Sequence, residues 1–203
     1  MRKIYLYKKY TEDGNAVKEI AEELMHSADK LYVVTEHSRE STKFDEAVNQ
    51  CSRGDVLIIE NLTDLGQETG EAIARLDKVI ASGICLVSSD VKATFMYGVS
   101  PDTNIIALQS IREMLLKAVN NGDRQYVFPT IVGRPEVNFP DGWDEKYNEW
   151  KNKKISSSDF LKWSGLKKAT FYNKVTQYRE ILESEKKYIE SIRTSEWAKN
   201  YMA

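Results

Sequence analysis

The stretch that decides the fold is residues 53–90, RGDVLIIENLTDLGQETGEAIARLDKVIASGICLVSSD. Its apolar run at residues 56–59 lies between polar turns, which is typical of a strand buried on both faces. A polar loop follows at residues 61–68. Apolar side chains then recur at helical spacing, at Ala72, Ile73, Leu76, Val79 and Ile80. Gly83 ends that helix and the next apolar run, at residues 84–87, begins a second strand, so the stretch predicts a strand–loop–helix–strand unit.

The same rhythm precedes this stretch in the chain. Apolar runs at residues 4–7 and 31–34 predict two earlier strands, each followed by the stripe of an amphipathic helix. Strands that alternate with helices predict an α/β domain with a mainly parallel central sheet. Because chemistry in such sheets usually lies in the loops after the strands, the loop at residues 61–68 is the first candidate for a functional site.

The pattern changes after residue 100. Apolar residues along residues 101–122 predict one long helix, whose wide apolar band fits either a buried helix or a helix shared with a second subunit. Residues 123–142 hold three of the four prolines and predict a linker. The expected organisation is therefore an α/β domain at residues 1–122, this linker, and a small all-α domain at residues 143–203.

The all-α part has the pattern of a helix-turn-helix. Trp143, Tyr147 and Trp150 share one helical face and are interpreted as core. Ser156 is a natural N-cap for the next helix, and Gly165 makes the turn to a second helix. The inner face of that second helix is expected to hold Phe171, Tyr172, Val175 and Tyr178. An extra amphipathic helix is expected beyond residue 179.

The outward positions of the second helix suit DNA. We place there Lys167, Lys168, Ala169, Thr170, Asn173, Lys174 and Gln177. Lysines bind phosphates, and the hydroxyl and amide side chains bind phosphate oxygens or base edges. Residues 151–179 contain eight basic residues and one acid, Asp159, which is the local charge excess that a DNA-binding surface needs. We predict DNA contacts for Lys153, Lys154, Lys167, Lys168, Thr170, Asn173, Lys174 and Gln177. The alternative is a solvated, lysine-rich helix pair that binds nothing.

Composition narrows the functional classes. The net charge of −2 excludes a globally basic nucleic-acid binder but allows a local basic patch. No apolar run approaches the ~20 residues of a membrane span, and the first residues continue into a strand rather than a signal peptide. We therefore expect a cytoplasmic protein that does not bind membranes.

The sequence gives no sign of a metal or other cofactor. Cys51 and Cys85 are expected to be reduced core thiols, and His26 and His37 lack partners at ligand spacing. No glycine-rich phosphate loop follows a strand. Four acids around the central strand and loop are interpreted as solvent-exposed rather than as metal ligands: Asp55, Glu60, Asp64 and Glu68.

Two parts of the chain resemble the resolvase/invertase serine recombinases. The first is Arg53-Gly54-Asp55 followed by an apolar strand, a leucine-bearing loop, a long helix, a glycine and a strand. The second is GRP at residues 133–135, a following tryptophan, Ile155-Ser156, and GLKKATFY at residues 165–172. Together they cover nearly the whole chain up to about residue 179. The resemblance implies a resolvase-like domain with an oligomerisation helix at about residues 101–122, a C-terminal helix-turn-helix, DNA as a partner, and a homodimer or higher homo-oligomer.

The family's catalytic residues are largely replaced. These enzymes attack a DNA phosphodiester with a serine and hold the phosphate with arginines. Their motif Tyr-x-Arg-Val-Ser-Thr corresponds to residues 7–12, so Thr11 stands for the serine and Lys9 for an arginine. In the central loop Asp64 and Gln67 replace two arginines, whereas Arg112 retains one. Losing a single phosphate-stabilising donor costs on the order of 10²–10³ in rate, so the resemblance implies that the recombinase chemistry is absent.

The resulting expectation is a DNA-binding pseudoenzyme of the serine-recombinase type. Its role would be accessory or regulatory in DNA recombination, in a phage or another mobile element. One alternative is an active site-specific recombinase that uses Thr11 as nucleophile, supported by Lys9 and Arg112. The other is a protein-interaction scaffold that does not bind DNA.

Overall fold

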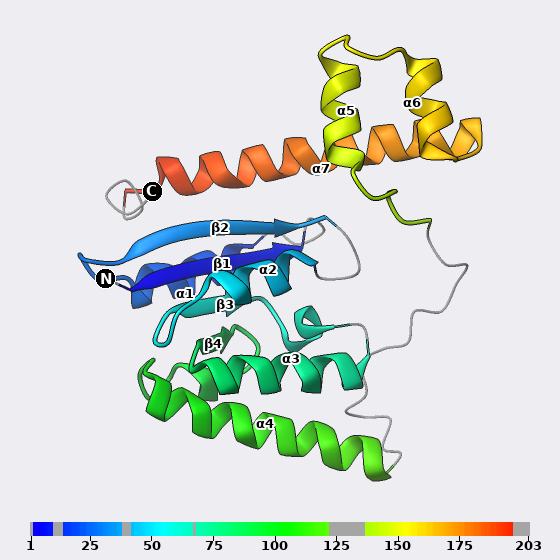
Figure 1. Ribbon diagram of the computed structural model, residues 1–203. Helices are drawn as coiled ribbons and strands as arrows, with labels where there is room; N and C mark the ends of the chain where they lie inside the picture. The colour runs from blue at the N-terminus through cyan, green and yellow to red at the C-terminus, as the bar shows by residue number, and fades with distance from the viewer. Residues whose placement is uncertain (1, 10–13, 38–41, 67, 122–136, 197–203) are drawn as a thin grey trace. The chain divides into compact units, whose positions relative to one another are not determined.

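The chain folds into two units, which are described separately. The computed structural model in Figure 1 describes residues 2–9, 14–37, 42–66, 68–121 and 137–196. The first unit comprises Met1–Val132 together with Lys187–Ala203, and the second comprises Gly133–Lys186. We call them the sheet unit and the helical unit.

Four parallel strands form the centre of the sheet unit. They are β1 (Lys3–Lys9), β2 (Lys30–Glu36), β3 (Val56–Ile59) and β4 (Cys85–Ser88), in the spatial order β2-β1-β3-β4. All three strand pairs are parallel. Every residue of β3 and β4 is buried, because helices or loops cover both faces of these strands. The α/β class and the parallel sheet predicted from the sequence are confirmed.

The crossover helices divide between the two faces of the sheet. Helix α1 (Asn15–Leu24) follows β1, whereas α2 (Thr42–Gln50) and α3 (Thr69–Ser82) follow β2 and β3. Parallel crossovers are right-handed, and the chain reverses its direction across the sheet after β2. Consequently α1 packs on one face, and α2, α3 and the following helix α4 (Pro101–Asn121) pack on the other (Figure 1).

The long helix α4 buries one side and exposes apolar side chains on another. Leu108, Ile111 and Leu115 lie in the core that α4 shares with α3. Ile106 and Met114 are 66% and 52% exposed. The apolar band that the sequence showed is therefore wider than the contact with α3 requires.

A side chain closes the outer edge of β4. The amide of Asn104 donates to the carbonyls of Leu86 and Thr94, both at 2.8 Å, and accepts from the Leu86 N–H at 2.9 Å. Asn104 thus replaces a neighbouring strand at an edge that would otherwise leave backbone groups unpaired. It also fixes the short helix η2 (Lys92–Thr94) and the start of α4 against the sheet.

The helical unit has an aromatic core. Its helices are α5 (Trp143–Lys151), α6 (Ser157–Ser164) and the first part of α7 (Lys168–Thr194), and α5 and α6 stand on that part of α7 (Figure 1). The buried side chains of the core are Trp143, Tyr147, Phe160, Phe171, Val175 and Tyr178. Gly165, with φ of 64°, ends α6 in the left-handed conformation that glycine adopts most easily.

The end of the chain differs from the sequence-based expectation. A separate helix was expected beyond residue 179, but α7 continues unbroken to Thr194, and from Lys187 onward the chain groups with the sheet unit. No glycine or proline interrupts α7, and most of its residues after 179 favour helix, so nothing local ends it earlier. Among the described residues, no helix combines the length and apolarity needed to cross a membrane.

Candidate functional site

The loop after β3 is built on its own capping bonds. It forms one short helix, η1 (Leu62–Leu65), at the carboxyl edge of the sheet. Asn61 Oδ1 accepts from the Thr63 N–H at 3.1 Å, and Asp64 Oδ2 accepts from the N–H groups of Glu60 and Asn61, each at 3.1 Å. This reciprocal capping satisfies backbone donors that the turn leaves open.

Asp64 also binds the lysine at the end of β1. The Asp64 side chain is fully buried, at 0% exposed, and Lys9 Nζ lies 2.9 Å from its Oδ1 atom. The same ammonium donates to the Thr63 carbonyl at 3.0 Å. A buried carboxylate needs such a partner, because an unpaired charge away from water is costly. The interpretation of Asp64 as a solvent-exposed acid was wrong, and it was wrong for Asp55 too, which is 5% exposed.

Arg75 on α3 holds the same loop from the other side. Its guanidinium donates to the Leu65 carbonyl at 2.7 Å and to the Asp45 carboxylate on α2 at 3.1 Å. The sequence analysis did not single out Arg75. The sequence could have indicated its contact with the loop, because an arginine on the helix that follows a polar loop can reach the loop carbonyls. Its contact with Asp45 could not be predicted, because Asp45 lies 30 residues away in the chain.

Two of the three predicted catalytic residues, Lys9 and Arg112, have different partners in the structure. Arg112 on α4 donates a hydrogen bond to Asp77 on α3, with 3.2 Å between Nη2 and Oδ2, and this bond raises the pKa of Arg112. Asp77 lies about 12 Å along the α3 axis from Thr69, which begins the helix next to the loop. Lys9 points instead to Asp64 in the loop. The third residue, Thr11, lies outside the described residues.

The two cysteines fit the expectation of core thiols. Cys85 is buried and Cys51 partly buried, and both are free. Burial raises the pKa of Cys51 to about 12. It also raises the pKa of Cys85 to about 11, so neither sulfur is a thiolate at neutral pH.

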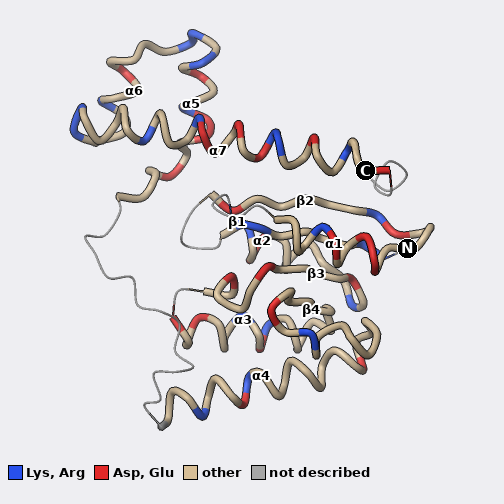
Figure 2. Tube along the Cα trace, turned by 180° about the vertical axis from the view of Figure 1, so that it is seen from behind, with Lys and Arg blue, Asp and Glu red and all other residues tan. Residues whose placement is uncertain are grey.

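A second group of predicted residues lies in the helical unit, partly between α5 and α6 and partly from the turn after α6 into the first half of α7. Lys153, Lys154, Lys167, Lys168 and Asn173 are exposed, and Thr170 and Gln177 are half-buried. Figure 2 shows basic segments after α5 and at the start of α7. The structure therefore exposes five of these side chains on the helical unit.

Lys174 does not belong to this set of exposed side chains. Its side chain was expected to face outward, but it is 6% exposed. Its ammonium donates to Gln177 Oε1 at 2.8 Å and lies 4.6 Å from the centre of the Phe139 ring. Conversely Tyr172, expected on the inner face, is 46% exposed. The spacing from Phe171 explains both errors, since position 174 shares its helical face and position 172 is turned about 100° away.

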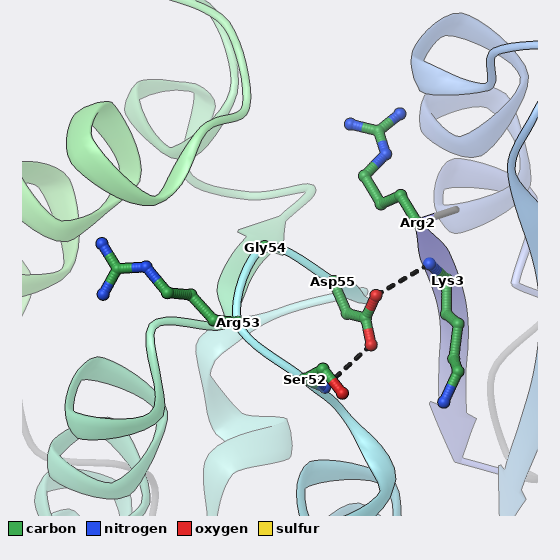
Figure 3. Close-up of a pocket in the computed structure, with 6 residues that line it drawn as sticks. All are labelled: Arg2, Lys3, Ser52, Arg53, Gly54 and Asp55. Atoms are coloured by element: carbon green, nitrogen blue, oxygen red, sulfur yellow. Dashed lines mark hydrogen bonds between the residues drawn. The ribbon is translucent and has the colours of Figure 1, made fainter.

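A hollow of about 290 Å³ lies at the opposite, amino edge of the sheet, as Figure 3 shows. Its lining consists of Arg2, Lys3, Ser52, Arg53, Gly54 and Asp55. The Asp55 carboxylate accepts from the N–H groups of Lys3 and Ser52, both at 2.8 Å. Arg2 binds Asp29 at 2.6 Å. The Asp55 contacts tie the start of β1 to the turn before β3, and the Arg2 contact ties it to the turn before β2, which is a structural role.

Comparison with known proteins gives no relative for this chain: neither a family model nor a curated protein matches it. Within the parts of the chain that the structure describes, no group of three or more His, Cys, Asp or Glu side chains is placed to hold a metal ion. The two candidate functional sites are the loop after β3 and the exposed lysines of the helical unit.

Asp64 provides a test of how the central loop is built. Asp64→Ala removes the acceptor of two N–H groups and the carboxylate that pairs with Lys9, so the free energy of unfolding should fall by about 3 kcal/mol. Asp64→Asn keeps an acceptor and should lose less. The measurement is urea denaturation.

The matched control is Asp77→Ala on the neighbouring helix. The Asp77 side chain is 48% exposed and pairs with Arg112 at the surface, so this change should cost under about 1 kcal/mol. Equal losses for Asp64→Ala and Asp77→Ala would contradict the account of the loop.

Proposed function

We propose that this chain binds duplex DNA through its helical unit and is a serine-recombinase-like protein with a degenerate catalytic centre. In this proposal α6, the turn at Gly165 and α7 form a helix-turn-helix, and the first half of α7 is the recognition helix. The role is accessory or regulatory, in recombination or in the biology of a mobile element. The observation that carries the proposal is that Lys167, Lys168 and Asn173, at the turn and the start of α7, are exposed in a stretch with few acids.

Charge at this surface supports DNA as the ligand. Lys153, Lys154, Lys167 and Lys168 are exposed, and the phosphates of a duplex release bound cations when lysines neutralise them. The one acid among residues 151–179, Asp159, is hydrogen-bonded to Ser156 at the start of α6. A hydrogen bond from Ser156 Oγ to Asp159 Oδ2, at 2.6 Å, lowers the pKa of Asp159. The Asp159 N–H donates to Ser156 Oγ at 3.1 Å and caps α6.

The aromatic core supports the same proposal. Phe160 on α6 and Phe171 on α7 meet edge to face, with ring centres 4.9 Å apart, and Trp143 on α5 covers both. Such contacts fix the angle between α6 and α7. A fixed angle lets the exposed Lys167, Lys168 and Asn173 approach a groove as one rigid surface.

Loss of catalysis is supported by the pair between Lys9 and Asp64. A phosphoryl-transfer site needs cations free to meet the developing negative charge. Here the lysine in the family's arginine position is bound to a buried carboxylate, and that carboxylate occupies the position of another arginine. Arg112 is bound to Asp77 on a different part of α3.

The DNA proposal predicts a charge-dependent affinity. Lys167→Glu/Lys168→Glu should weaken binding to a duplex by about two orders of magnitude at low salt. The slope of log affinity against log salt concentration should also become smaller. A fluorescence-anisotropy titration across a salt series measures both quantities.

The control has the same change in net charge. Lys78→Glu/Lys92→Glu alters two exposed lysines of the sheet unit and should leave affinity within about threefold of the wild type. If the unchanged protein does not bind DNA at low salt, or if both double variants lose affinity equally, the proposed surface is wrong.

The degenerate centre predicts no strand cleavage. Incubation with supercoiled plasmid should leave the topology unchanged and give no covalent protein–DNA adduct on denaturing gels. An adduct that forms with the wild type and disappears in Thr11→Ala would establish the active recombinase instead.

We also propose that α4 forms a homodimer contact. The exposed Ile106 and Met114 support it, because apolar side chains on a surface helix often mark a subunit interface. Ile106→Glu/Met114→Glu should weaken self-association at least about 100-fold in sedimentation experiments, while Asn49→Glu/Gln50→Glu at exposed positions of α2 should not. A wild type that stays monomeric at high concentration refutes this contact.

A further inference from the structure

The last turns of α7 are built into the core of the sheet unit. Tyr188 and Ile192, one turn apart, are 6% and 0% exposed. They belong to the same buried cluster as Leu6 on β1 and Val17 on α1. The sheet face that carries α1 is therefore completed by a segment that lies at the other end of the chain.

The contact around Tyr188 is closely fitted. Its hydroxyl donates to the Gly14 carbonyl at 3.2 Å, and the ammonium of Lys8, which is 1% exposed, lies 4.6 Å from the centre of its ring. A Cβ atom on Gly14 would lie 2.6 Å from that ring. Nearby, Lys18 Nζ donates to the Ser191 carbonyl at 3.4 Å. The position before α1 must therefore be glycine as long as Tyr188 is in place.

The first part of the same helix is fixed in the helical unit. Phe171, Val175 and Tyr178 lie in the aromatic core there. Between these anchors, residues 183–187 are exposed or half-buried. A charged helical segment with little burial is marginally stable in water, so its order depends on the anchors at both ends.

We propose that Tyr188 and Ile192 are positioning residues for DNA binding that act through α7. This inference rests on the proposed function, in which the first half of α7 is the recognition helix. Docking of the last turns keeps α7 helical beyond the aromatic core before DNA arrives, so the recognition helix does not fray at that end and less ordering is left to the binding step. Coupling between two sites is reciprocal, so bound DNA must in turn stabilise the docked turns and the part of the sheet unit that they cover.

The first test is the DNA affinity of Tyr188→Ala in the full chain. Affinity should fall about tenfold, a coupling of ordinary size, although Tyr188 carries no charge and lies in the sheet unit. The slope of affinity against salt should stay unchanged, because the phosphate contacts are the same. Tyr188→Phe keeps the ring over Lys8 and should recover most of the affinity.

Tyr97→Ala is the matched control, since Tyr97 belongs to the same unit and is 76% exposed. It should bind DNA like the wild type. If Tyr188→Ala also binds like the wild type, the inference is overturned and the proposed function survives. If the unchanged chain does not bind DNA, the proposed function fails and this inference fails with it.

The second test needs no variant and so avoids any folding defect of Tyr188→Ala. Amide hydrogen exchange of β1 and α1 should slow when a duplex binds to the wild type, because DNA favours the docked turns. Unchanged exchange in β1 and α1 at saturating DNA would overturn the inference, whatever the variants do.

Discussion

A parallel sheet has to be covered on both faces, and the rest of this structure follows from how that is achieved. The order β2-β1-β3-β4 and right-handed crossovers place α2 and α3 on one face, where α4 joins them. The other face receives only one crossover helix, α1. The strand side chains on the α1 face are as apolar as those on the face that α2 and α3 cover. A second helix is therefore needed on the α1 face, and the last turns of α7 supply it. The end of the chain is therefore part of the sheet unit, while the helix that carries it begins in the helical unit.

At the carboxyl edge of the sheet, charged side chains are paired with one another. Asp64 is buried, accepts two backbone hydrogen bonds and binds Lys9. These contacts stabilise the loop by fixing charges to each other, whereas a phosphate site needs cations that are fixed but unpaired. The carboxylate therefore works as a structural cap, and by the same contacts it withdraws the nearest cation from any substrate.

Much of the sheet could be predicted from the sequence, because its signals are local. The runs at residues 56–59 and 84–87 are apolar throughout, which indicates strands covered on both faces, and the helix between them has a clear apolar stripe ending at Gly83. The contact of Lys9 with the loop was not predicted, since Lys9 was considered only as the counterpart of an arginine in the resembling family.

The failures share a different cause. Asp64, Arg75 and Asn104 are polar residues whose roles depend on partners remote in the chain or on backbone groups freed by a turn, and no periodicity reports such partners. Lys174 and Tyr172 were misplaced because residue chemistry was given more weight than helical angle. The docking of Tyr188 could not be foreseen, because its contacts lie more than 170 residues away, on a surface defined only once the sheet has formed.

The central claim is that DNA binds at the turn between α6 and α7, and an NMR titration tests it most directly. Amide shifts of the isotope-labelled protein would be followed as duplex DNA is added at low salt. The account predicts that the largest changes fall on Lys167, Lys168 and Asn173, with smaller ones at Lys153 and Lys154, while Lys9 and Asp64 change little. Shifts centred on the loop at residues 61–66, or no shifts at saturating DNA, would contradict it.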